Sequence, residues 1–201
     1  MSVSVLIPVG PQAEQSHLLE AFQSVAHDPL VTEVLLVTDR FQGEMPVEIR
    51  ESAKVRILQS SVPGIASALN LGIRAASSRW ILRLDADDVR VEGTLADQLA
   101  VLHEGKFAVV GGQAVTFGEM PHHTGRLRVP TSERKVRYLL LAKNALIHPS
   151  VLMDREQIML VQGYNAAASR IEDYDLWLRL IANGSRLANV QETVIKYRLH
   201  A

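Results

Sequence analysis

Residues 80–88 read WILRLDADD (Trp80–Asp88), a short apolar run that leads directly into three carboxylates. The run predicts a buried strand, because a short apolar segment that ends in turn-forming residues is typical of strands covered on both faces. In open α/β sheets, ligands bind at the carboxyl ends of such strands. The stretch therefore predicts an α/β fold and also the edge of the sheet at which a ligand would bind.

Other predicted strands and helices alternate with this strand through the first half of the chain. Strands are expected at 3–9, 34–37 and 55–58, and helices at 13–27, 64–76 and 94–103. Alternation of this kind implies a mostly parallel sheet with helices on both faces. We expect residues 1–201 to form a single domain, with a Rossmann-like half at 1–105 and a less regular half at 106–201.

The second half carries weaker patterns. Helices are expected at 132–142 and 171–183, strands at 107–117, 145–153 and 194–199, and a loop at 118–130. Within these segments, the strand of 145–153 is centred on His148, and Leu141 is counted among the buried side chains.

The composition is that of an ordinary folded protein and excludes several classes. Of the 201 residues 47% are hydrophobic, and 21 Lys+Arg against 22 Asp+Glu give a net charge of -1. This balance argues against a protein that coats nucleic acid. The chain has no cysteine, which excludes disulfides and thiolate metal sites. Without a signal peptide or a transmembrane run, we expect a cytoplasmic protein, and association with the inner face of the membrane stays open.

Asp85, Asp87 and Asp88 place three carboxylates within four positions. Crowded carboxylates repel one another unless protons or a cation compensate. Mg²⁺ and Mn²⁺ bind carboxylates together with phosphate oxygens and water. The alternative is an acidic turn that caps the next helix, and the cluster alone leaves both interpretations open.

A second acidic group, Glu172-Asp173-Tyr174-Asp175, stands at the start of the predicted helix 171–183. Acids at this position stabilise a helix through its macrodipole. A positioned carboxylate can instead act as a general base that takes the proton of an attacking hydroxyl. Two acidic clusters far apart in the sequence can converge in one cleft.

Asp39 follows the second predicted strand at the same sheet edge. Its carboxylate could accept a hydrogen bond from a base or a ribose hydroxyl, or it could form a local turn. Pro8 and Val9 end the first strand, where their backbone groups could face a base.

The histidines leave more alternatives open. His148 is more commonly interpreted as a structural histidine. His200 could bind a metal or a phosphate, although a lone histidine is a weak signal. His122-His123, with Arg126 and Arg128, could form a patch for phosphate or acceptor, or a solvated loop.

Taken in order, these stretches resemble the inverting glycosyltransferases of family 2, which have the GT-A fold. The resemblance spans nearly the whole chain and is strongest at Trp80–Asp88. It continues at 148–153 (HPSVLM), 163–164 (GY), 172–180 (EDYDLWLRL) and 197–200 (YRLH).

The resemblance implies a role for each matching position. Asp173 is the catalytic base. The donor site comprises two groups: the metal and diphosphate ligands Asp87, Asp85, Asp88 and His200, with Asp87 the most direct ligand, and the nucleotide-sugar contacts Pro8, Val9, Asp39, Asp85 and Asp87.

The resemblance also implies an activity. The chain would move a single sugar from a nucleotide-diphosphate sugar, expected to be a UDP-sugar, to a saccharide or lipid-linked acceptor in cell-surface polysaccharide synthesis. The cofactor would be Mn²⁺ or Mg²⁺, and one in-line displacement would invert the anomeric carbon. The Gln-x-x-Arg-Trp motif and the membrane helices of processive synthases are not found in the sequence, which favours non-processive transfer.

Two departures and two alternatives accompany this prediction. Many relatives have Tyr-Asn where this chain has Gly10-Pro11, and an acidic pair where it has Thr38-Asp39. Both positions belong to the nucleotide pocket, so the identity of the nucleobase is not fixed. A nucleotidyltransferase would share the nucleotide-binding half but usually carries a basic, Gly-rich loop, whereas residues 10–14 contain no Lys or Arg. A non-catalytic nucleotide-sugar binder is the other alternative.

Overall fold

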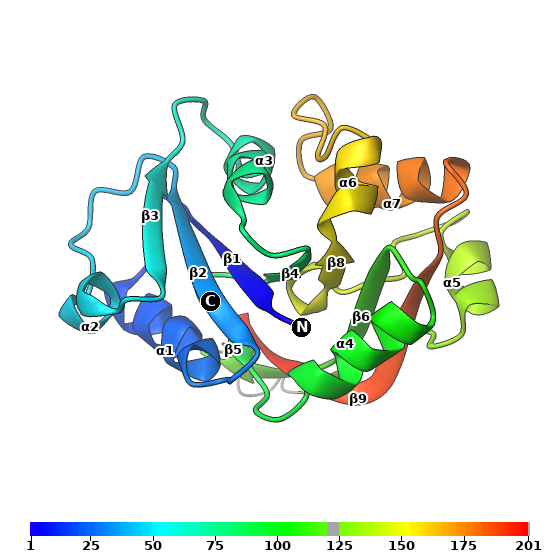
Figure 1. Cartoon of the computed structure of the whole chain (residues 1–201), viewed down its shortest axis with the longest axis horizontal. Coiled ribbons are helices and arrows are strands. Elements are labelled where there is room, and N and C mark those ends of the chain that lie inside the picture. Colours follow the sequence, from blue (N-terminus) through cyan, green and yellow to red (C-terminus); the bar gives the residue numbers. More distant parts are fainter. Residues whose placement is uncertain (120–124, 201) are drawn as a thin grey trace.

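The computed structural model describes residues 1–119 and 125–200, and its first half follows the predicted alternation (Figure 1). The elements of the first half are β1 (Val3–Val9), α1 (Gln15–Ala26), β2 (Val31–Thr38), α2 (Val47–Glu51), β3 (Val55–Gln59), α3 (Ile65–Ala75), β4 (Trp80–Arg83), β5 (Val89–Arg90) and α4 (Leu95–Glu104). Those of the second half are β6 (Val109–Gly118), β7 (Arg126–Leu127), α5 (Glu133–Leu139), a 3-10 turn (His148–Ser150), β8 (Leu152–Asp154), α6 (Arg155–Leu160), α7 (Glu172–Ala182) and β9 (Leu187–Leu199).

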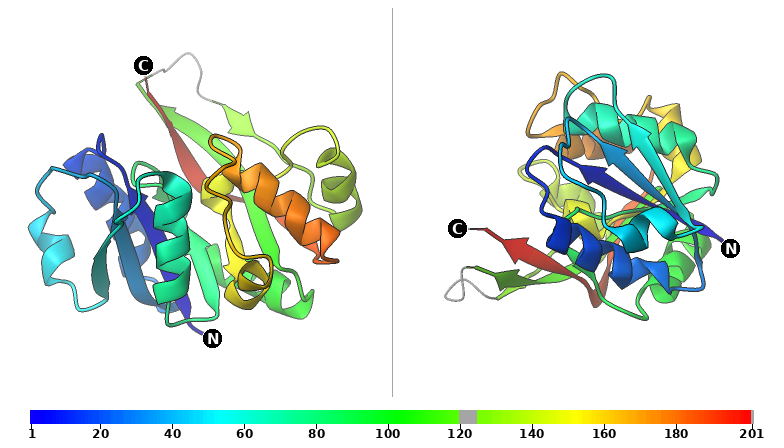
Figure 2. Two further views of the ribbon diagram at one scale, coloured as in Figure 1. Left: turned by 90° about the horizontal axis from the view of Figure 1, so that it is seen from above. Right: turned by 90° about the vertical axis from the view of Figure 1, so that its left-hand side faces the viewer.

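The strands join in one curled sheet of mixed direction, as Figures 1 and 2 show. Within the described residues the order is β3-β2-β1-β4-β8-β6-β9-β5, and β7 pairs with β6 at the side. The first four strands are parallel, as expected from the alternation with helices. In the second half β6 and β9 are parallel, while β8, β5 and β7 pair antiparallel with their neighbours. The α/β fold with a less regular second half is confirmed.

Helices cover both faces of the sheet, and alternate residues of β1 show why. Val5 and Ile7 point into one core, which α1, α2 and α4 complete. Leu6 points into the other, which α3, α5, α6 and α7 complete. Successive side chains of a strand face opposite sides, so an uninterrupted apolar strand needs a cover on both. Because β1, β2 and β4 are parallel, their carboxyl ends lie together at one edge of the sheet.

Gly72 lets α3 lie close to β1. A Cβ at this position would come within 2.1 Å of the Leu6 side chain, so any larger residue would require Leu6 or the helix to shift. The helix begins at Ile65, and the N–H of the preceding Gly64 donates to Asp39 at the carboxyl end of β2.

Two predictions for the second half are wrong. Residues 148–150 form a 3-10 turn rather than the centre of a strand, and the strand begins after it at Leu152. Pro149 removes a backbone donor that a strand would need. Leu141 is 77% exposed rather than buried, because α5 ends at Leu139 and the chain turns outward after Leu140, while Leu140 is buried and Leu139 packs partly against the core. The strand predicted at 107–117 is present as β6, with register shifts between Gly111 and Ala114 in its pairing with β9.

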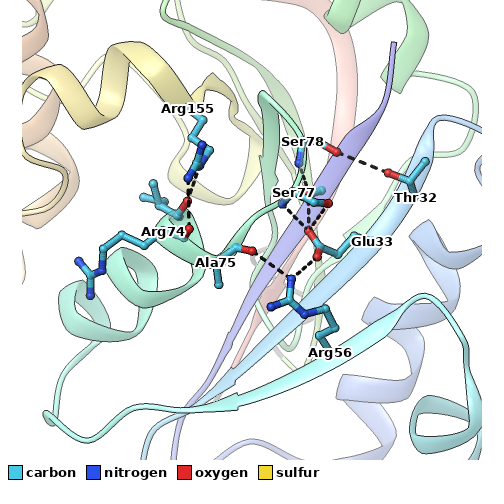
Figure 3. A network of polar contacts seen from close by, with 10 residues as sticks. Thr32, Glu33, Arg56, Arg74, Ala75, Ser77, Ser78 and Arg155 are labelled. Carbon is cyan, nitrogen blue, oxygen red and sulfur yellow. Dashed lines mark hydrogen bonds and ion pairs between the residues drawn. The ribbon is translucent and has the colours of Figure 1, made fainter.

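A buried carboxylate ties the amino-terminal side of the parallel strands together (Figure 3). Glu33 on β2 accepts hydrogen bonds from the hydroxyl of Ser4, from the N–H and hydroxyl of Ser77, and from the guanidinium of Arg56. Burial raises the pKa of Glu33, but these donors offset that effect and hold the pKa below its usual value. Arg155 closes the same region by donating to the last carbonyls of α3.

We predict that Glu33→Gln lowers the free energy of unfolding by about 1–3 kcal/mol at neutral pH, because buried donors lose a charged acceptor. A carboxyl whose pKa is lowered by folding stabilises the protein above its unfolded pKa, about 4.3, and loses this contribution as the pH falls through the folded pKa. Urea denaturation at pH 7 and near pH 3.5 should therefore show a difference between wild type and variant that shrinks in acid.

The matched control is Glu51→Gln on α2, where the side chain is exposed. This variant should unfold like the wild type at both pH values. An equal effect of the two substitutions would contradict the account of Glu33.

Candidate active site

A cavity of about 700 Å³ opens at the carboxyl ends of β1, β2 and β4. It is lined by the end of β1 and the loop to α1, by the end of β2, by the start of α3 and by the turn after β4. From the sequence-based predictions the lining includes Pro8, Val9, Asp39, Asp85, Asp87 and His200. The fold thus brings residues from both ends of the chain together at the edge of the sheet where ligands bind in open α/β folds.

The acidic cluster forms one side of the cavity. One carboxylate oxygen each of Asp85, Asp87 and Asp88 can be chosen so that all three lie within 4.8 Å of one another. At such separations three negative charges repel strongly. The surrounding groups show how each charge is compensated.

Arg83 compensates Asp85. Its guanidinium, which is only 2% exposed, donates to both carboxylate oxygens of Asp85 at 2.7 and 2.6 Å. A buried two-point ion pair of this kind fixes the carboxylate in one orientation. Both oxygens of Asp85 are therefore engaged before any ligand arrives.

Asp88 is the least compensated of the three. Its side chain is 1% exposed, Oδ1 accepts a hydrogen bond of 2.8 Å from the backbone N–H of Arg198, and Oδ2 is buried without a partner in the described part of the chain. Burial, with the charges of Asp85 and Asp87, raises the pKa of Asp88 to about 8, against the lowering effect of the Arg198 N–H and of Arg83. An unpaired oxygen here needs a proton or a cation.

Arg198 at the end of β9 and His200 just after it supply the side chains around Asp87. His200 Nε2 lies 2.6 Å from Asp87 Oδ2, and Arg198 Nε donates to the backbone carbonyl of Asp87 at 2.7 Å. Arg198 also pairs with Glu20 on α1 and stacks over the ring of Phe117, 4.4 Å from its centroid. Arg198 thereby fixes the turn after β4 against α1 and β9.

The residues present fit a hard divalent cation. The donor set is two carboxylates, Asp87 and Asp88, with an imidazole from His200, and no group of the described residues donates a hydrogen bond to Oδ2 of Asp88. Mg²⁺ and Mn²⁺ take such ligands and complete their shells with phosphate and water. Asp85 fits less directly, because Arg83 already engages both of its oxygens.

Asp39 lies at the opposite end of the cavity. Its carboxylate accepts a 2.8 Å hydrogen bond from the N–H of Gly64 and a second from Arg40. Burial raises the pKa of Asp39, but these two donors lower it below its usual value, so the group is ionised at neutral pH. Gly64 has φ 108°, which a side chain would strain, and this backbone turn aims its N–H at Asp39.

Asp173 stands at the start of α7 and is not among the described residues that line the cavity. Its Oδ2 accepts a 2.6 Å hydrogen bond from the side-chain amide of Asn144, and its Oδ1 accepts one from the N–H of Tyr174. These bonds leave further lone pairs of the carboxylate free to accept a proton.

Tyr164 lies between the two acidic groups. Its pKa is raised first by burial, and it also responds to the charges of Asp173 and Glu172 on one side and of Arg83 and Asp85 on the other. The hydroxyl lies 2.8 Å from His148 Nε2, and burial together with the charge of Arg83 holds the pKa of His148 well below its usual value. His148 is thus a neutral member of the packing beneath the site, in line with its structural interpretation.

The sequence reasoning missed several residues of this site, notably Arg83, Arg198, Asn144 and Tyr164. Arg83 had a readable signal, because a single charge inside an apolar strand needs a buried partner. His122 and His123 lie outside the described residues, while Arg126 and Arg128 are exposed on and beside β7.

Residues 4–158 match the sequence model of the family described as glycosyl transferase family 2, which is more than half of the chain. The chain belongs to glycosyl transferase family 2. It is similar to an uncharacterised glycosyltransferase of Haemophilus influenzae, with 26% identity over 99% of this chain and 76% of the relative. It is also similar to the O-antigen biosynthesis glycosyltransferase WbnJ of Escherichia coli, with 28% identity over 73% of this chain and 58% of the relative.

The chain is also similar to two proteins whose names include a sugar nucleotide. The E. coli UDP-Gal:alpha-D-GlcNAc-diphosphoundecaprenol beta-1,3-galactosyltransferase is 24% identical over 97% of this chain and 73% of its own length. The crystal structure of S. aureus TarS 1-349 in complex with UDP-GlcNAc superimposes with a TM-score of 0.75 and 17% identity, over 100% of this chain and 59% of that chain. The latter shows the GT-A fold, and this chain spans 59% of that 1-349 chain and 37% of the longer TarS chain.

In the part of the chain that the structure describes, no helix combines the length and the apolar character needed to cross a bilayer.

We predict that Asp88 makes the metal-free protein less stable as the pH rises. The folded state keeps a proton on Asp88 up to a pKa of about 8, whereas the unfolded state loses it near ~3.9. Between these values the folded state binds more protons, so the free energy of unfolding falls with increasing pH. Because Mg²⁺ replaces the proton, it should raise the melting temperature more at pH 8.5 than at pH 6.

Scanning calorimetry of the wild type and of Asp88→Asn, with and without Mg²⁺, measures both effects. The variant cannot ionise at this position, so the difference in stability between the two proteins should change steadily across this pH range. A difference that is independent of pH would show that Asp88 is not protonated in the fold.

Proposed function

We propose that the chain transfers a single sugar from a nucleotide-diphosphate sugar, with UDP as the expected nucleotide, to a saccharide or lipid-linked acceptor, with inversion at the anomeric carbon. The observation that carries the proposal is the cavity that joins the acidic cluster to Asp39 at the carboxyl edge of the sheet. Family membership and the sugar nucleotides named for two similar proteins support it. The relative named for O-antigen biosynthesis favours a role in cell-surface polysaccharide synthesis.

The two ends of the cavity suit the two ends of such a donor. At one end, the ionised Asp39 can accept a hydrogen bond from a base N–H or a ribose hydroxyl, and the backbone of Pro8 and Val9 lies beside it. At the other end, Asp87, Asp88 and His200 would hold Mn²⁺ or Mg²⁺. A divalent ion there supplies positive charge to the departing diphosphate.

Asp85 has a different part in this scheme. Since Arg83 fixes its carboxylate rigidly, Asp85 presents a preoriented acceptor edge at the cavity wall rather than a mobile metal ligand. A hydroxyl of the ribose or of the sugar could donate to this edge. Orientation of this kind keeps the anomeric carbon in place for attack.

Asp173 would serve as the general base. As the acceptor oxygen bonds to the anomeric carbon, the bond from that carbon to the diphosphate oxygen breaks, and the hydroxyl proton moves to the Asp173 carboxylate. Asn144 and the N–H of Tyr174 hold this carboxylate in position. A single displacement with one base inverts the configuration of the sugar.

The proposal predicts separable losses for the two acidic groups. Asp87→Ala should weaken metal-dependent binding of the donor by about tenfold or more, which corresponds to at least ~1.4 kcal/mol. Asp173→Asn should leave donor binding unchanged and slow transfer by about 10²–10⁴-fold, the usual contribution of a general base. A calorimetric screen of UDP-, GDP- and dTDP-sugars with and without Mn²⁺ identifies the donor, and NMR of the product reports its anomeric configuration.

Two controls carry equivalent changes at carboxylates that have no assigned part in the reaction. Asp97→Ala removes an exposed carboxylate of α4, and Asp175→Asn changes a neighbour of Asp173 that pairs with Arg179 instead. Asp97→Ala should bind donor like the wild type, and Asp175→Asn should transfer the sugar at the wild-type rate. Full transfer by Asp173→Asn would refute the base assignment, and donor binding without any turnover would favour a non-catalytic nucleotide-sugar binder.

A further inference from the structure

The helix α5 and the turn after it form an exposed surface with a distinct composition. We call this surface the basic face, and it comprises Arg134, Lys135, Arg137, Tyr138, Leu141 and Lys143. Val136 and Leu140 turn the other way and anchor the segment in the core, so the exposure of the basic face is a fixed property of the fold.

The charge of the basic face is almost uncompensated. Glu133 is the one carboxylate in residues 131–143, and Arg186 already donates to it, at 2.7 and 3.0 Å. Among the described residues, none of the four cations of the face forms an ion pair with a carboxylate, although Arg137 lies near enough to lower the pKa of Glu133. The chain as a whole carries a net charge of -1, so this positive charge is a local concentration.

Apolar side chains stand among these cations. Leu141 is 77% exposed, the highest value among the exposed large apolar residues of the described chain, and Tyr138 is 62% exposed. The guanidinium of Arg134 lies over the Tyr138 ring, 5.7 Å from its centroid. Large apolar and aromatic residues that protrude between Lys and Arg are typical of surfaces that lie in a lipid headgroup layer.

The basic face adjoins the proposed catalytic base. Tyr174 Oη donates to the carbonyl of Leu140 at 2.6 Å, and Asn144 donates to Asp173 at 2.6 Å. Both contacts join the turn after α5 to the first turn of α7. A surface that receives the basic face is therefore brought next to Asp173.

We propose that the basic face docks on an anionic membrane surface and presents the Asp173 side of the site to it. The presentation of the Asp173 side to the membrane rests on the proposed function, because it makes a lipid-linked saccharide the acceptor. Charge complementarity favours an anionic leaflet, and the exposed Leu141 and Tyr138 favour a partner with an apolar layer beneath its charges.

Vesicle flotation without any sugar nucleotide tests the docking separately from catalysis. The full chain should bind vesicles that contain phosphatidylglycerol, should bind phosphatidylcholine vesicles weakly, and should be released by salt. Each Lys or Arg near an anionic leaflet strengthens binding about fivefold, so Arg134→Gln with Lys135→Gln should weaken it about 25-fold. Leu141→Ser, which keeps every charge, should also weaken it.

The matched control for the double variant is Arg50→Gln with Arg74→Gln, two exposed arginines on α2 and α3. This control should bind anionic vesicles like the wild type, and circular dichroism melts confirm that every variant is folded. Equal losses in the two double variants, equal binding to both kinds of vesicle, or no binding to anionic vesicles would each overturn the proposal. The last result would leave an acidic protein as the occupant. Because the readout needs no donor or acceptor, failure of the proposed transferase reaction leaves this test unaffected.

Discussion

Three carboxylates at the end of β4 repel one another, and the rest of the site is arranged around that repulsion. Asp85 is compensated from within its own strand by Arg83, and Asp87 and Asp88 are approached by Arg198 and His200 from the end of β9. The pairing of β5 with β9 places Arg198 there, since Val89 lies opposite Lys196. One buried oxygen of Asp88 is still unpaired within the described residues, and this makes the cluster receptive to a cation.

The two halves of the sheet contribute different parts of the site. The parallel half opens at its carboxyl edge and forms the cavity with Asp39, and Gly64 at the start of α3 donates the hydrogen bond that holds Asp39 ionised. The mixed half returns β9 to the acidic cluster and carries α7 with Asp173. His148 and Tyr164, joined by a 2.8 Å contact between His148 Nε2 and the Tyr164 hydroxyl, lie between them, and neither is among the described residues that line the cavity. The arrangement explains why donor binding and base catalysis should be separable by mutation.

Much of this fold can be predicted from the sequence, because β1, β2 and β4 are apolar on both faces and α1, α3 and α7 have helical periodicity. The acidic cluster could be placed at the sheet edge for the same reason. The 3-10 turn at residues 148–150 could not be predicted, since a short apolar segment with Pro149 is compatible with a strand or a tight turn. Leu141 was misplaced because three consecutive leucines do not show where a helix ends.

The contacts between side chains in the site were harder to predict from the sequence than the fold. The spacing of Asp87 and His200 gives no sign that they lie 2.6 Å apart, because the contact depends on the register of β5 with β9. Arg83 could have been recognised as buried, but its choice of Asp85 rather than Asp88 is a result of packing. The roles of Asp85, Asp87, Asp88, Asp173 and His200 in the reaction stay predictions until they are measured.

Paramagnetic resonance of Mn²⁺ tests the central claim most directly, that the acidic cluster holds a divalent cation against a nucleotide diphosphate. In the presence of UDP the chain should reduce the free Mn²⁺ signal, and the bound ion should show coupling to the phosphorus nuclei of the diphosphate. Asp87→Ala should restore the free signal, whereas Asp97→Ala should not. A free Mn²⁺ signal that the wild-type chain and UDP leave unchanged would contradict the account.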